Sequence, residues 1–528
     1  MSVRRIMGTE TEYAVSAVGA TNASPERLSA AVVSAAADPR TSHIRWDYGQ
    51  EDPVNDARGH RLARAQARPE MLTDEPQSQI TNVIAPNAGR IYVDHAHPEY
   101  SAPETDDPFE AVLYDCAGDV LMERAAASAS QASAPAIRLY RNNVDGKGAS
   151  WGTHENYMML RSVPFMQVAD LLTAHFVSRQ IYAGSGRVGL GEHSQSAGFQ
   201  LSQRADSIHT ALGLQTTFDR PIVNTRDEPH SDRRFRRVHV IVGDANRMQI
   251  PQLLKLGTTS LVLWLLESAQ ALGIDLSDLS ACLNLIDPVE ALHTVSHDLT
   301  LGAALPLVDG ASTTAWQMQV NLRGAVYAMG ARVYGTDTRG EPQWPDTATK
   351  RVVTMWGQAL RDVAAVRHAD DDARLALREP AARIEWLLKW QLLERLRRRM
   401  TATWNDARLA AFDLRWAALD RHESIFPAFS DRVRHVYDDD AVAAACAQAP
   451  QDTRAWCRAA LIALAPERVV AVSWSRVIVR DDGAPHGLRT LDMADPRGFT
   501  RAWADGATAA QPTDRDAAAW VGDILQRR

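Results

Sequence analysis

Residues 89–100 read GRIYVDHAHPEY, and residues 5–15 read RIMGTETEYAV. Residues 5–15 are predicted to form one β-strand, and residues 89–94 are predicted to form another. Successive side chains of a strand point to opposite faces, so Glu10 and Glu12 share one face. Two carboxylates on one face repel each other unless that face is solvated or binds a cation. This pair therefore indicates either an exposed edge strand or the wall of a cation site.

The other stretch ends in a strongly polar turn. Tyr92 and Asp94 share a strand face, and His95, His97 and Glu99 follow directly. Magnesium prefers hard oxygen ligands, which this segment supplies. A zinc site is disfavoured because the histidines have no matching cysteine and no HExxH motif. The alternative is a strand-end turn with ordinary polar surface residues.

Outward from these strands, hydrophobic periodicity predicts a mixture of helices and strands. Helices are expected at residues 25–37, 108–131, 250–275, 375–400, 452–464 and 515–526, and further strands at residues 137–142, 154–160, 238–242 and 469–479. Residues 45–85 are polar, contain proline and have no clear period, which predicts a functional or disordered loop. Residues 431–450, rich in Asp and Ala, predict a linker to a small C-terminal domain.

The overall composition narrows the class of protein. The chain has 528 residues and a formal net charge of -8, so we expect one large and one smaller domain and no general nucleic-acid binding. The sequence contains no run of about 18 apolar residues, so we expect no membrane span. Residues 1–13 lack the apolar core of a secretory signal, so we expect a cytoplasmic protein. The four scattered cysteines predict neither structural zinc nor disulfides.

Further polar clusters lie at residues 141–145, 152–157, 224–230 and 243–246, and His239 interrupts an apolar strand. Such side chains are costly to bury unless they are paired or bound, so several clusters on one sheet favour a shared ligand cavity. The sequence has no Walker A motif and no glycine-rich dinucleotide loop, so arginines are the candidate phosphate contacts. Arg90, Arg204 and Arg226 each lie inside a polar motif. Trp474, on a predicted strand, would either stack on a purine or pack in the core.

Six blocks run through nearly the whole chain: GTETEY at residues 8–13, YVDHAHPEYSAPE at 92–104, NNVDGKGASWGTHENYM at 142–158, SQRAD at 202–206, RPIVNTRDEPHSD at 220–232 and RVHVIVGDAN at 237–246. Together they resemble the Pup deamidase/depupylase family. Pup is the small, disordered prokaryotic ubiquitin-like protein that marks substrates for bacterial proteasomes. The Pup ligase, a sibling of that family, shares most of these motifs. The histidine-rich segment from Asp94 to Glu99 and the long segment from Trp46 to about Asn82 favour the deamidase.

The resemblance implies an α+β fold of the glutamine-synthetase type. A large catalytic domain, residues 1–430, would contain an antiparallel β-sheet cradle backed by helices, with a regulatory-type loop at residues 45–85. A small α/β domain would follow at residues 431–528. We expect a monomer.

Carried over position by position, the resemblance also implies roles for individual residues. Mg²⁺ ions would be surrounded by Glu10, Tyr92, Glu99, His154 and His239. ATP, or ADP plus phosphate, would be held by Arg90 and Trp474, with Arg204 and Arg226 on the phosphates. Asp94 would act as nucleophile or as general base. The chain departs from the pattern at Ala102, where relatives can have a hydroxyl side chain that contacts nucleotide.

The implied reaction is hydrolysis of a side-chain amide. The C-terminal glutamine of Pup would become glutamate, and the isopeptide bond between Pup and a substrate lysine would be cleaved, with ATP required but not spent in each turnover. One alternative is a Pup ligase that forms a γ-glutamyl phosphate. Another is a non-catalytic Pup-binding relative, against which the intact Glu10, Asp94 and Glu99 argue. Because Pup is acidic, the arginine clusters at residues 233–237 and 395–399 are candidates for its binding groove.

Overall fold

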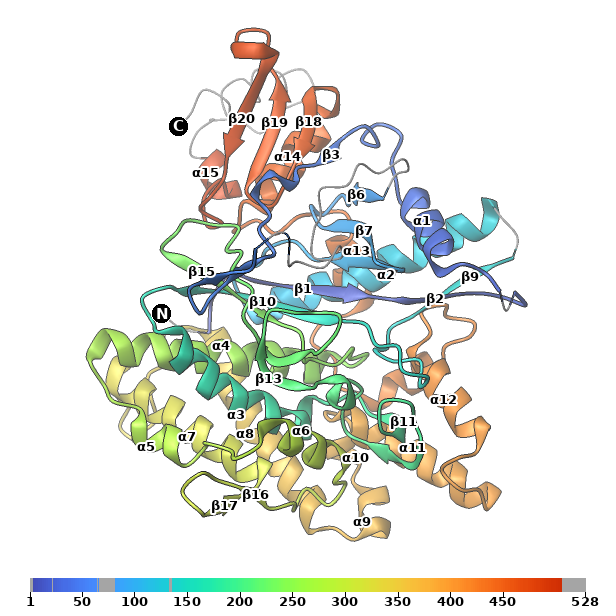
Figure 1. Ribbon diagram of the computed structural model, residues 1–528, viewed down its shortest axis with the longest axis vertical. Coiled ribbons are helices and arrows are strands. Elements are labelled where there is room, and N and C mark those ends of the chain that lie inside the picture. The colour runs from blue at the N-terminus through green and yellow to red at the C-terminus, as the bar shows by residue number, and fades with distance from the viewer. Residues whose placement is uncertain (1–2, 21, 64, 66–80, 133–134, 506–528) are drawn as a thin grey trace.

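The structure is a computed structural model that describes residues 3–20, 22–63, 65, 81–132 and 135–505. Within these residues the centre is a six-stranded antiparallel sheet with strand order β15-β10-β1-β8-β7-β6 (Figure 1). Its strands are β15 (Phe235–Val240), β10 (Thr153–Leu160), β1 (Met7–Glu12), β8 (His97–Ser101), β7 (Arg90–Asp94) and β6 (Asn82–Ile84). The strands predicted around Glu10 and Asp94, β1 and β7, lie in the same sheet and flank β8. The predicted α+β fold is confirmed.

The two faces of this sheet differ because strand side chains alternate in direction. On one face, Thr9 Oγ1 donates a 2.9 Å hydrogen bond to Asp115 of helix α2 (Pro108–Ala132), and Tyr100 is buried beneath the same helix. Helix α4 (Gln249–Leu272) packs beside α2 and over β10. The opposite face carries charged and polar side chains. The sheet is therefore one wall of a cradle whose back is closed by helices.

A layer of helices surrounds α4 on the side away from the polar face. It contains α3 (Phe165–Ala183), α6 (Pro288–His297), α7 (Ala315–Tyr334), α8 (Thr347–His368) and α11 (Glu385–Met400). Their apolar side chains share one hydrophobic core with α4, which includes the fully buried Trp264, Trp356 and Trp386. None of the helices in the described part of the chain combines the length and apolar character needed to cross a lipid bilayer.

Shorter elements complete the fold. The other α-helices within the described residues are α1 (Pro25–Ala35), α5 (Ser277–Ala281), α9 (Asp371–Ala376), α10 (Arg378–Ala381), α12 (Ala407–Ala417), α13 (Asp439–Ala445), α14 (Ala455–Leu464) and α15 (Arg501–Asp505). Paired short strands are β2 (Ala14–Ala17) with β9 (Ile137–Tyr140), β4 (Asn55–Asp56) with β5 (His60–Arg61), β11 (Arg187–Leu190) with β12 (Ser196–Gln200), β13 (Thr210–Gly213) with β14 (Pro221–Asn224), and β16 (Leu305–Pro306) with β17 (Ser312–Thr313). The helix predicted at residues 515–526 lies outside the described residues.

A second, four-stranded sheet lies at one end of the molecule, with strand order β20-β19-β18-β3 (Figure 1). The single strand predicted at residues 469–479 is wrong: β18 (Val469–Val472) and β19 (Arg476–Arg480) form a hairpin, and β20 (Leu488–Asp492) pairs with β19. The turn is closed by the hydrogen bond from Ser473 N–H to Arg476 O. Trp474 therefore lies in a turn and not on a strand.

Two segments expected to lack structure contain short elements. Within the expected loop at residues 45–85, β3 (Arg45–Trp46) pairs in parallel with β18, and Trp46 is buried in the core of the small sheet. Within the expected linker at residues 431–450, α13 packs against α2 because Val442 and Ala445 are buried. The domain boundary at residues 430 and 431 stays a prediction.

A buried ion network joins the small sheet to the central one. Glu104, three residues beyond β8, accepts hydrogen bonds of 2.7 Å from Arg454 Nε and 2.6 Å from Arg458 Nη2. Arg458 in turn donates to the Trp474 carbonyl at 3.0 Å, and its guanidinium lies 5.2 Å from the centre of the indole ring. Glu104 thus fixes the turn that carries Trp474.

We expect Glu104→Gln to lower the free energy of unfolding by about 3 kcal/mol near neutral pH, because two buried arginines lose their partner. Burial raises the pKa of Glu104, but Arg458 and Arg454 outweigh it and lower the pKa to about 2. A pKa below that of the unfolded chain means stability present above about pH 4.5 and lost as the pH falls toward 2. Urea titrations at about pH 7 and about pH 3.5 should therefore show a smaller penalty at the lower pH. Glu467→Gln, at an exposed position, is the control. An equal loss of unfolding free energy at the two pH values, or an equal loss in Glu467→Gln, would contradict the assigned role of Glu104.

Candidate active site

The strand register brings residues distant in sequence onto the polar face of the central sheet. Glu10 of β1 lies directly opposite His154 of β10, and Asn156 of β10 lies opposite His239 of β15. Residues that lie directly opposite each other in an antiparallel pair share a face and have neighbouring Cβ atoms. Side chains from three adjacent strands therefore meet at one place.

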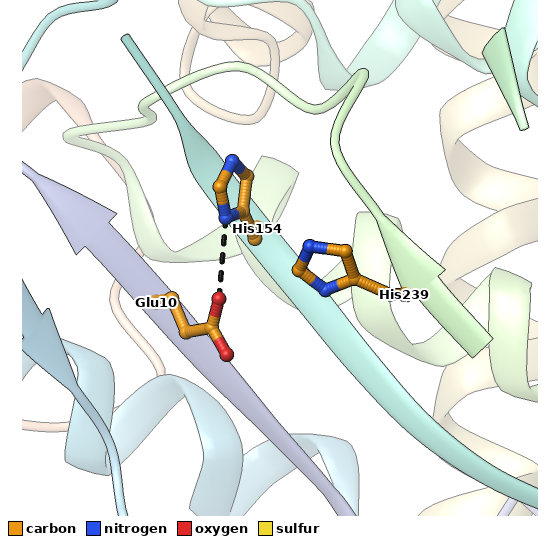
Figure 2. A group of neighbouring side chains, drawn as sticks. All are labelled: Glu10, His154 and His239. Atoms are coloured by element: carbon orange, nitrogen blue, oxygen red, sulfur yellow. Dashed lines mark hydrogen bonds and ion pairs between the residues drawn. The ribbon is translucent and has the colours of Figure 1, made fainter. Parts of the chain in front are cut away.

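The first cluster on this face is Glu10, His154 and His239 (Figure 2). One potential ligand atom from each residue lies within 4.8 Å of the others, and His154 Nδ1 lies 3.2 Å from Glu10 Oε2. Figure 2 shows the two imidazole rings and the carboxylate pointing toward one another from their three strands. Burial raises the pKa of Glu10, but His154, His239 and Arg237 outweigh it and lower the pKa below its usual range. Glu10 is therefore ionised at neutral pH.

Gly152 determines how His154 faces this cluster. A Cβ at residue 152 would lie 2.0 Å from His154 Nε2, so only glycine allows the ring to take its place. With Nε2 against Gly152, Nδ1 is the nitrogen that faces Glu10. The Gly152 N–H also donates a 2.9 Å hydrogen bond to Glu12 Oε1. The same backbone segment therefore orients His154 of this cluster and the neighbouring carboxylate of Glu12.

We expect Gly152→Ala to push His154 out of position and to weaken Mn²⁺ binding by about 10-fold or more, while overpacking lowers stability by only about 1–3 kcal/mol. Titration of Mn²⁺ followed by electron paramagnetic resonance measures the affinity. Gly324→Ala is the matched control, because a Cβ at residue 324 meets nothing within 4 Å. Equal affinity in the two variants would show that His154 does not depend on this contact.

The second cluster, Glu12, Asp94 and Glu99, lies on the neighbouring strands of the same face. Burial raises the pKa of Glu99 well above its usual range, and the charges of Asp94, Glu12 and Glu10 raise it further. For Glu12 burial is outweighed by its hydrogen bond with His97 and by nearby positive charges, which lower its pKa to about 2. Of Glu12 and Glu99, Glu99 is therefore the one whose ionised form is disfavoured by the neighbouring carboxylates.

Asp94 is the accessible carboxylate of this cluster. It ends β7 and pairs with His97 across a two-residue turn in which His95 has a positive φ of 51°. The Asp94 side chain is 38% exposed and lies 3.1 Å from His95 Nδ1, whereas Glu99 is only 1% exposed. Of these two carboxylates, Asp94 is therefore the one that a ligand can reach.

The donor atoms of both clusters fit hard divalent cations. Carboxylate oxygens are the ligands that Mg²⁺ and Mn²⁺ prefer, and imidazole is an accepted additional ligand. Glu99 Oε2 is buried and accepts no hydrogen bond from any described residue. A buried carboxylate oxygen in that state is stabilised by a bound cation. The chemistry of the residues present is thus compatible with the Mg²⁺ that the sequence implies.

A pocket opens beside the first cluster, toward the small sheet. Its lining includes Gly8, Ala102, Asn156, His230, Arg237, Arg454 and Trp474. An indole ring at the mouth of a pocket, with arginines at its sides, suits a flat heterocycle that carries an anionic group. Trp474 makes an edge-to-face contact with Trp46, at 5.2 Å between ring centres.

Arg90 lies between aromatic rings next to this pocket. Its guanidinium carbon lies 4.1 Å from the centre of the Trp46 ring and 4.0 Å from that of Tyr92. Arg90 Nε donates a 2.8 Å hydrogen bond to Asn82 Oδ1. Arg90 is not among the described residues that line the pocket itself, so its link to Trp474 runs through Trp46.

A model of the Pup-ligase protein family matches residues 5–478, which include both carboxylate clusters and Trp474. The chain belongs to this family. The depupylase of Acidothermus cellulolyticus is 41% identical over 507 residues, 95% of each chain. The Pup deamidase/depupylase of Mycolicibacterium smegmatis is 41% identical over 90% of this chain and 91% of its own. A Pup–protein ligase of Corynebacterium aurimucosum is 34% identical over 93% of each chain.

Solved structures of Pup ligases have the same fold. A ligase in complex with Pup matches with a TM-score of 0.73 and 28% identity, covering 94% of this chain and 90% of its own. A ligase in complex with ADP matches with a TM-score of 0.68 and 28% identity, covering 85% and 91%. This chain therefore has the fold that was predicted from the resemblance, and it shares that fold with the Pup ligases.

The remaining sequence-predicted site residues lie around the two clusters. Tyr92 pairs with Glu99 across β7 and β8, and its hydroxyl accepts a 3.4 Å hydrogen bond from Ser101. Arg204 is buried, and neither its Nε nor its Nη2 has a hydrogen-bond partner among the described residues. Arg226 Nε lies 3.9 Å from Glu228 Oε2 and makes no hydrogen bond to a described residue. Both arginines therefore retain donors for an anion.

Other polar clusters singled out in the sequence belong to the scaffold. Asp244 accepts hydrogen bonds from the backbone N–H groups of Ser185, Gln203 and Arg204. Asn143 accepts one from the N–H of Ala245 at 2.7 Å. These hydrogen bonds hold neighbouring loops together.

Several residues of the site were not assigned from the sequence. Glu12 was assigned only as the partner of Glu10, Arg237 only as part of the arginine cluster at residues 233–237, and Asn156 and Trp46 had no individual role. The strand alternation of Glu10, Glu12 and of His154, Asn156 was a usable signal for two of them. Trp46 had no local signal, because its place depends on pairing with β18, more than four hundred residues later.

Several arginines of the two clusters at residues 233–237 and 395–399 form ion pairs with nearby acidic side chains. Arg237 pairs with Glu228 at 3.1 Å and faces the site, and Arg234 pairs with Asp232. Arg397 and Arg398 both pair with Glu394, each through its Nε at 2.7 Å. Much of their charge is neutralised, and a Pup groove at these clusters stays a prediction.

Proposed function

We propose that this chain is a Mg²⁺- and nucleotide-dependent amidohydrolase that deamidates the C-terminal glutamine of Pup and cleaves the Pup–lysine isopeptide bond. The observation that carries the proposal is the position of Asp94. It is an accessible carboxylate at a hairpin tip, beside a cluster of buried carboxylates that fits divalent cations. The identity of 41% to depupylases, against 34% to a Pup ligase, supports the hydrolytic branch of the family.

Each side chain has a defined task in this proposal. Asp94 would attack the side-chain carbonyl carbon of the terminal residue, forming an anhydride and releasing ammonia or the lysine amine, and water would then cleave the anhydride. Alternatively, Asp94 would take a proton from the attacking water. His95, with Nδ1 3.1 Å from Asp94 Oδ1, would hold that carboxylate in orientation. The cations would supply charge stabilisation at the carbonyl oxygen.

The nucleotide would occupy the pocket beside the first cluster. Trp474 lines this pocket and is placed to stack on the purine. Arg204 and Arg226 are not among the described residues that line it, but they have unused donors for phosphate oxygens. The solved structure of a Pup ligase in complex with ADP supports nucleotide binding in this family. Ala102 lines the same pocket, so the hydroxyl contact seen in the family pattern is replaced by a methyl group. We propose ATP, or ADP plus phosphate, together with Mg²⁺, as the cofactors.

A separate hollow provides room for the substrate tail. It is lined by residues that include Trp151, Lys147 and Arg187, and among the described residues it shares no lining residue with the nucleotide pocket. Trp151 packs against His97, at 5.0 Å between ring centres, and His97 pairs with Asp94 in the β7–β8 hairpin. Trp151 thus links the hollow to the hairpin that carries Asp94, although Asp94 is not among the described residues that line the hollow.

The deciding test is mass spectrometry of glutamine-ended Pup incubated with the protein, Mg²⁺ and ATP. Conversion of the amide to the acid adds about one dalton. No mass change, but conjugation of glutamate-ended Pup to a lysine-bearing protein with release of ADP, would assign the chain to the ligase branch instead. Binding of Pup without either reaction would mean a non-catalytic relative.

A further inference from the structure

Asn156 occupies the centre of the first cluster, between the ligand candidates and the nucleotide pocket. Its Nδ2 donates a 3.0 Å hydrogen bond to Glu10 Oε1. Its Oδ1 lies 2.9 Å from Arg237 Nη1 and 2.9 Å from His239 Nδ1. One amide group therefore contacts a carboxylate, a guanidinium and an imidazole at the same time.

The partners determine which way this amide points. A guanidinium only donates hydrogen bonds, so the atom facing Arg237 must be the oxygen. An ionised carboxylate only accepts, so the atom facing Glu10 must be the NH₂ group. Arg237 cannot easily turn away, because it also donates to the Glu228 carbonyl at 2.9 Å and to Glu228 Oε2 at 3.1 Å. The orientation of the amide follows from this chemistry alone.

The orientation of the amide in turn determines where the proton of His239 lies. Nδ1 of His239 faces Asn156 Oδ1, which only accepts, so Nδ1 must carry the hydrogen. His239 is 3% exposed, and a histidine binds a metal ion as the neutral imidazole. A neutral imidazole with hydrogen on Nδ1 has an unprotonated Nε2. Nε2 is then available as a metal ligand.

We propose that Asn156 is a positioning residue that fixes His239 as the Nδ1–H tautomer and holds the Glu10 carboxylate, so that both offer lone pairs to a divalent cation. Metal-bound histidines are commonly oriented by a hydrogen bond from the ring nitrogen that does not bind the metal. This inference rests on the proposed cation site, but it does not depend on which reaction the protein catalyses.

Nuclear magnetic resonance of the metal-free protein tests the tautomer directly. Two-bond ¹H–¹⁵N correlations of protein labelled with ¹⁵N only in histidine report the tautomer of each ring, and the His239 signals are assigned by their loss in His239→Gln. We expect the Nδ1–H tautomer in the wild-type protein, a shift toward Nε2–H in Asn156→Ala, and recovery of Nδ1–H in Asn156→Asp, whose carboxylate restores the acceptor. An Nε2–H tautomer in the wild type, or an unchanged tautomer in Asn156→Ala, would overturn the proposal.

Binding of Mn²⁺ alone, without nucleotide or Pup, tests the consequence. We expect Asn156→Ala to bind Mn²⁺ about 10- to 100-fold more weakly than the wild type, the usual cost of removing the partner of a ligand. Asn321→Ala on helix α7 is the control for loss of an asparagine outside the cluster. Lower stability of Asn156→Ala with unchanged Mn²⁺ affinity would mean a purely structural role and would overturn the proposal. Because both readouts omit Pup, failure of the proposed reaction would leave them interpretable.

Discussion

Replacement of Asp94 by asparagine is expected to lower the rates of deamidation and isopeptide cleavage by about 10³-fold or more. A neutral amide neither attacks a carbonyl carbon nor takes a proton from water, so both proposed roles of Asp94 are lost. The substitution keeps the size of a side chain that is 38% exposed, so the fold should be unaffected. Asp94 is not among the described residues that line the nucleotide pocket, so the affinity for ATP should stay within about twofold.

Mass spectrometry of glutamine-ended Pup measures the first reaction, and gel analysis of a pupylated protein measures the second. Asp275→Asn, at an exposed position between α4 and α5, controls for removal of a surface carboxylate. If Asp94→Asn retained more than about a tenth of the wild-type rate, another group would have to be the nucleophile or base. A parallel loss of ATP binding would instead mean that Asp94 belongs to the nucleotide site.

Local alternation predicted which side chains of a strand share a face, but not which strands are neighbours. The alternation in residues 5–15 places Glu10 and Glu12 together, as the structure does. The pairing of Glu10 with His154 depends on two strands that are more than a hundred residues apart. No local propensity encodes such a pairing, because it is set by packing of the whole sheet. The resemblance to a family supplied this long-range information.

The errors in the small sheet have a different cause. Residues 469–479 were predicted as one strand because β-branched residues dominate on both sides of Ser473, Trp474 and Ser475. Serine favours turns through local hydrogen bonds, and two serines in three residues were a usable turn signal. The consequence is functional, since the turn presents Trp474 to the pocket and a strand would have placed it in a sheet.

Helix α8 could have been predicted, whereas α3 was harder. Asp346 caps the N-terminus of α8, and its buried residues fall on one face. Helix α3 is buried on most sides, including His175 and Arg179, so it lacks a polar stripe that would reveal a helical period. Arg179 is paired with Glu155 on the helix side of the central sheet, and this buried pair has no signature in either local segment.

In the metal-free protein, Glu99→Gln is expected to raise the free energy of unfolding by about 2 kcal/mol, because it removes a buried carboxylate that is repelled by its neighbours. Glu99 is 1% exposed and Oε2 has no hydrogen-bond partner among the described residues. The same substitution should lower the hydrolytic rate by about 10²-fold or more, since a lost ligand costs at least as much as a lost partner of a ligand. Stability and activity should therefore change in opposite directions.

Thermal unfolding with and without Mg²⁺ distinguishes this cause from better packing. A cation that binds only the folded state at about 100 times its dissociation constant adds about 2.7 kcal/mol of stability. The wild type should gain this increment, and Glu99→Gln should lose most of it. Glu104→Gln is the matched control, because Glu104 lies five residues further along the chain and is mostly buried but is paired with Arg454 and Arg458. It should destabilise the protein and keep the Mg²⁺ increment. If Glu99→Gln also destabilised the metal-free protein and kept the increment, Glu99 would not be a cation ligand, and the second cluster would be held together by contacts other than a metal.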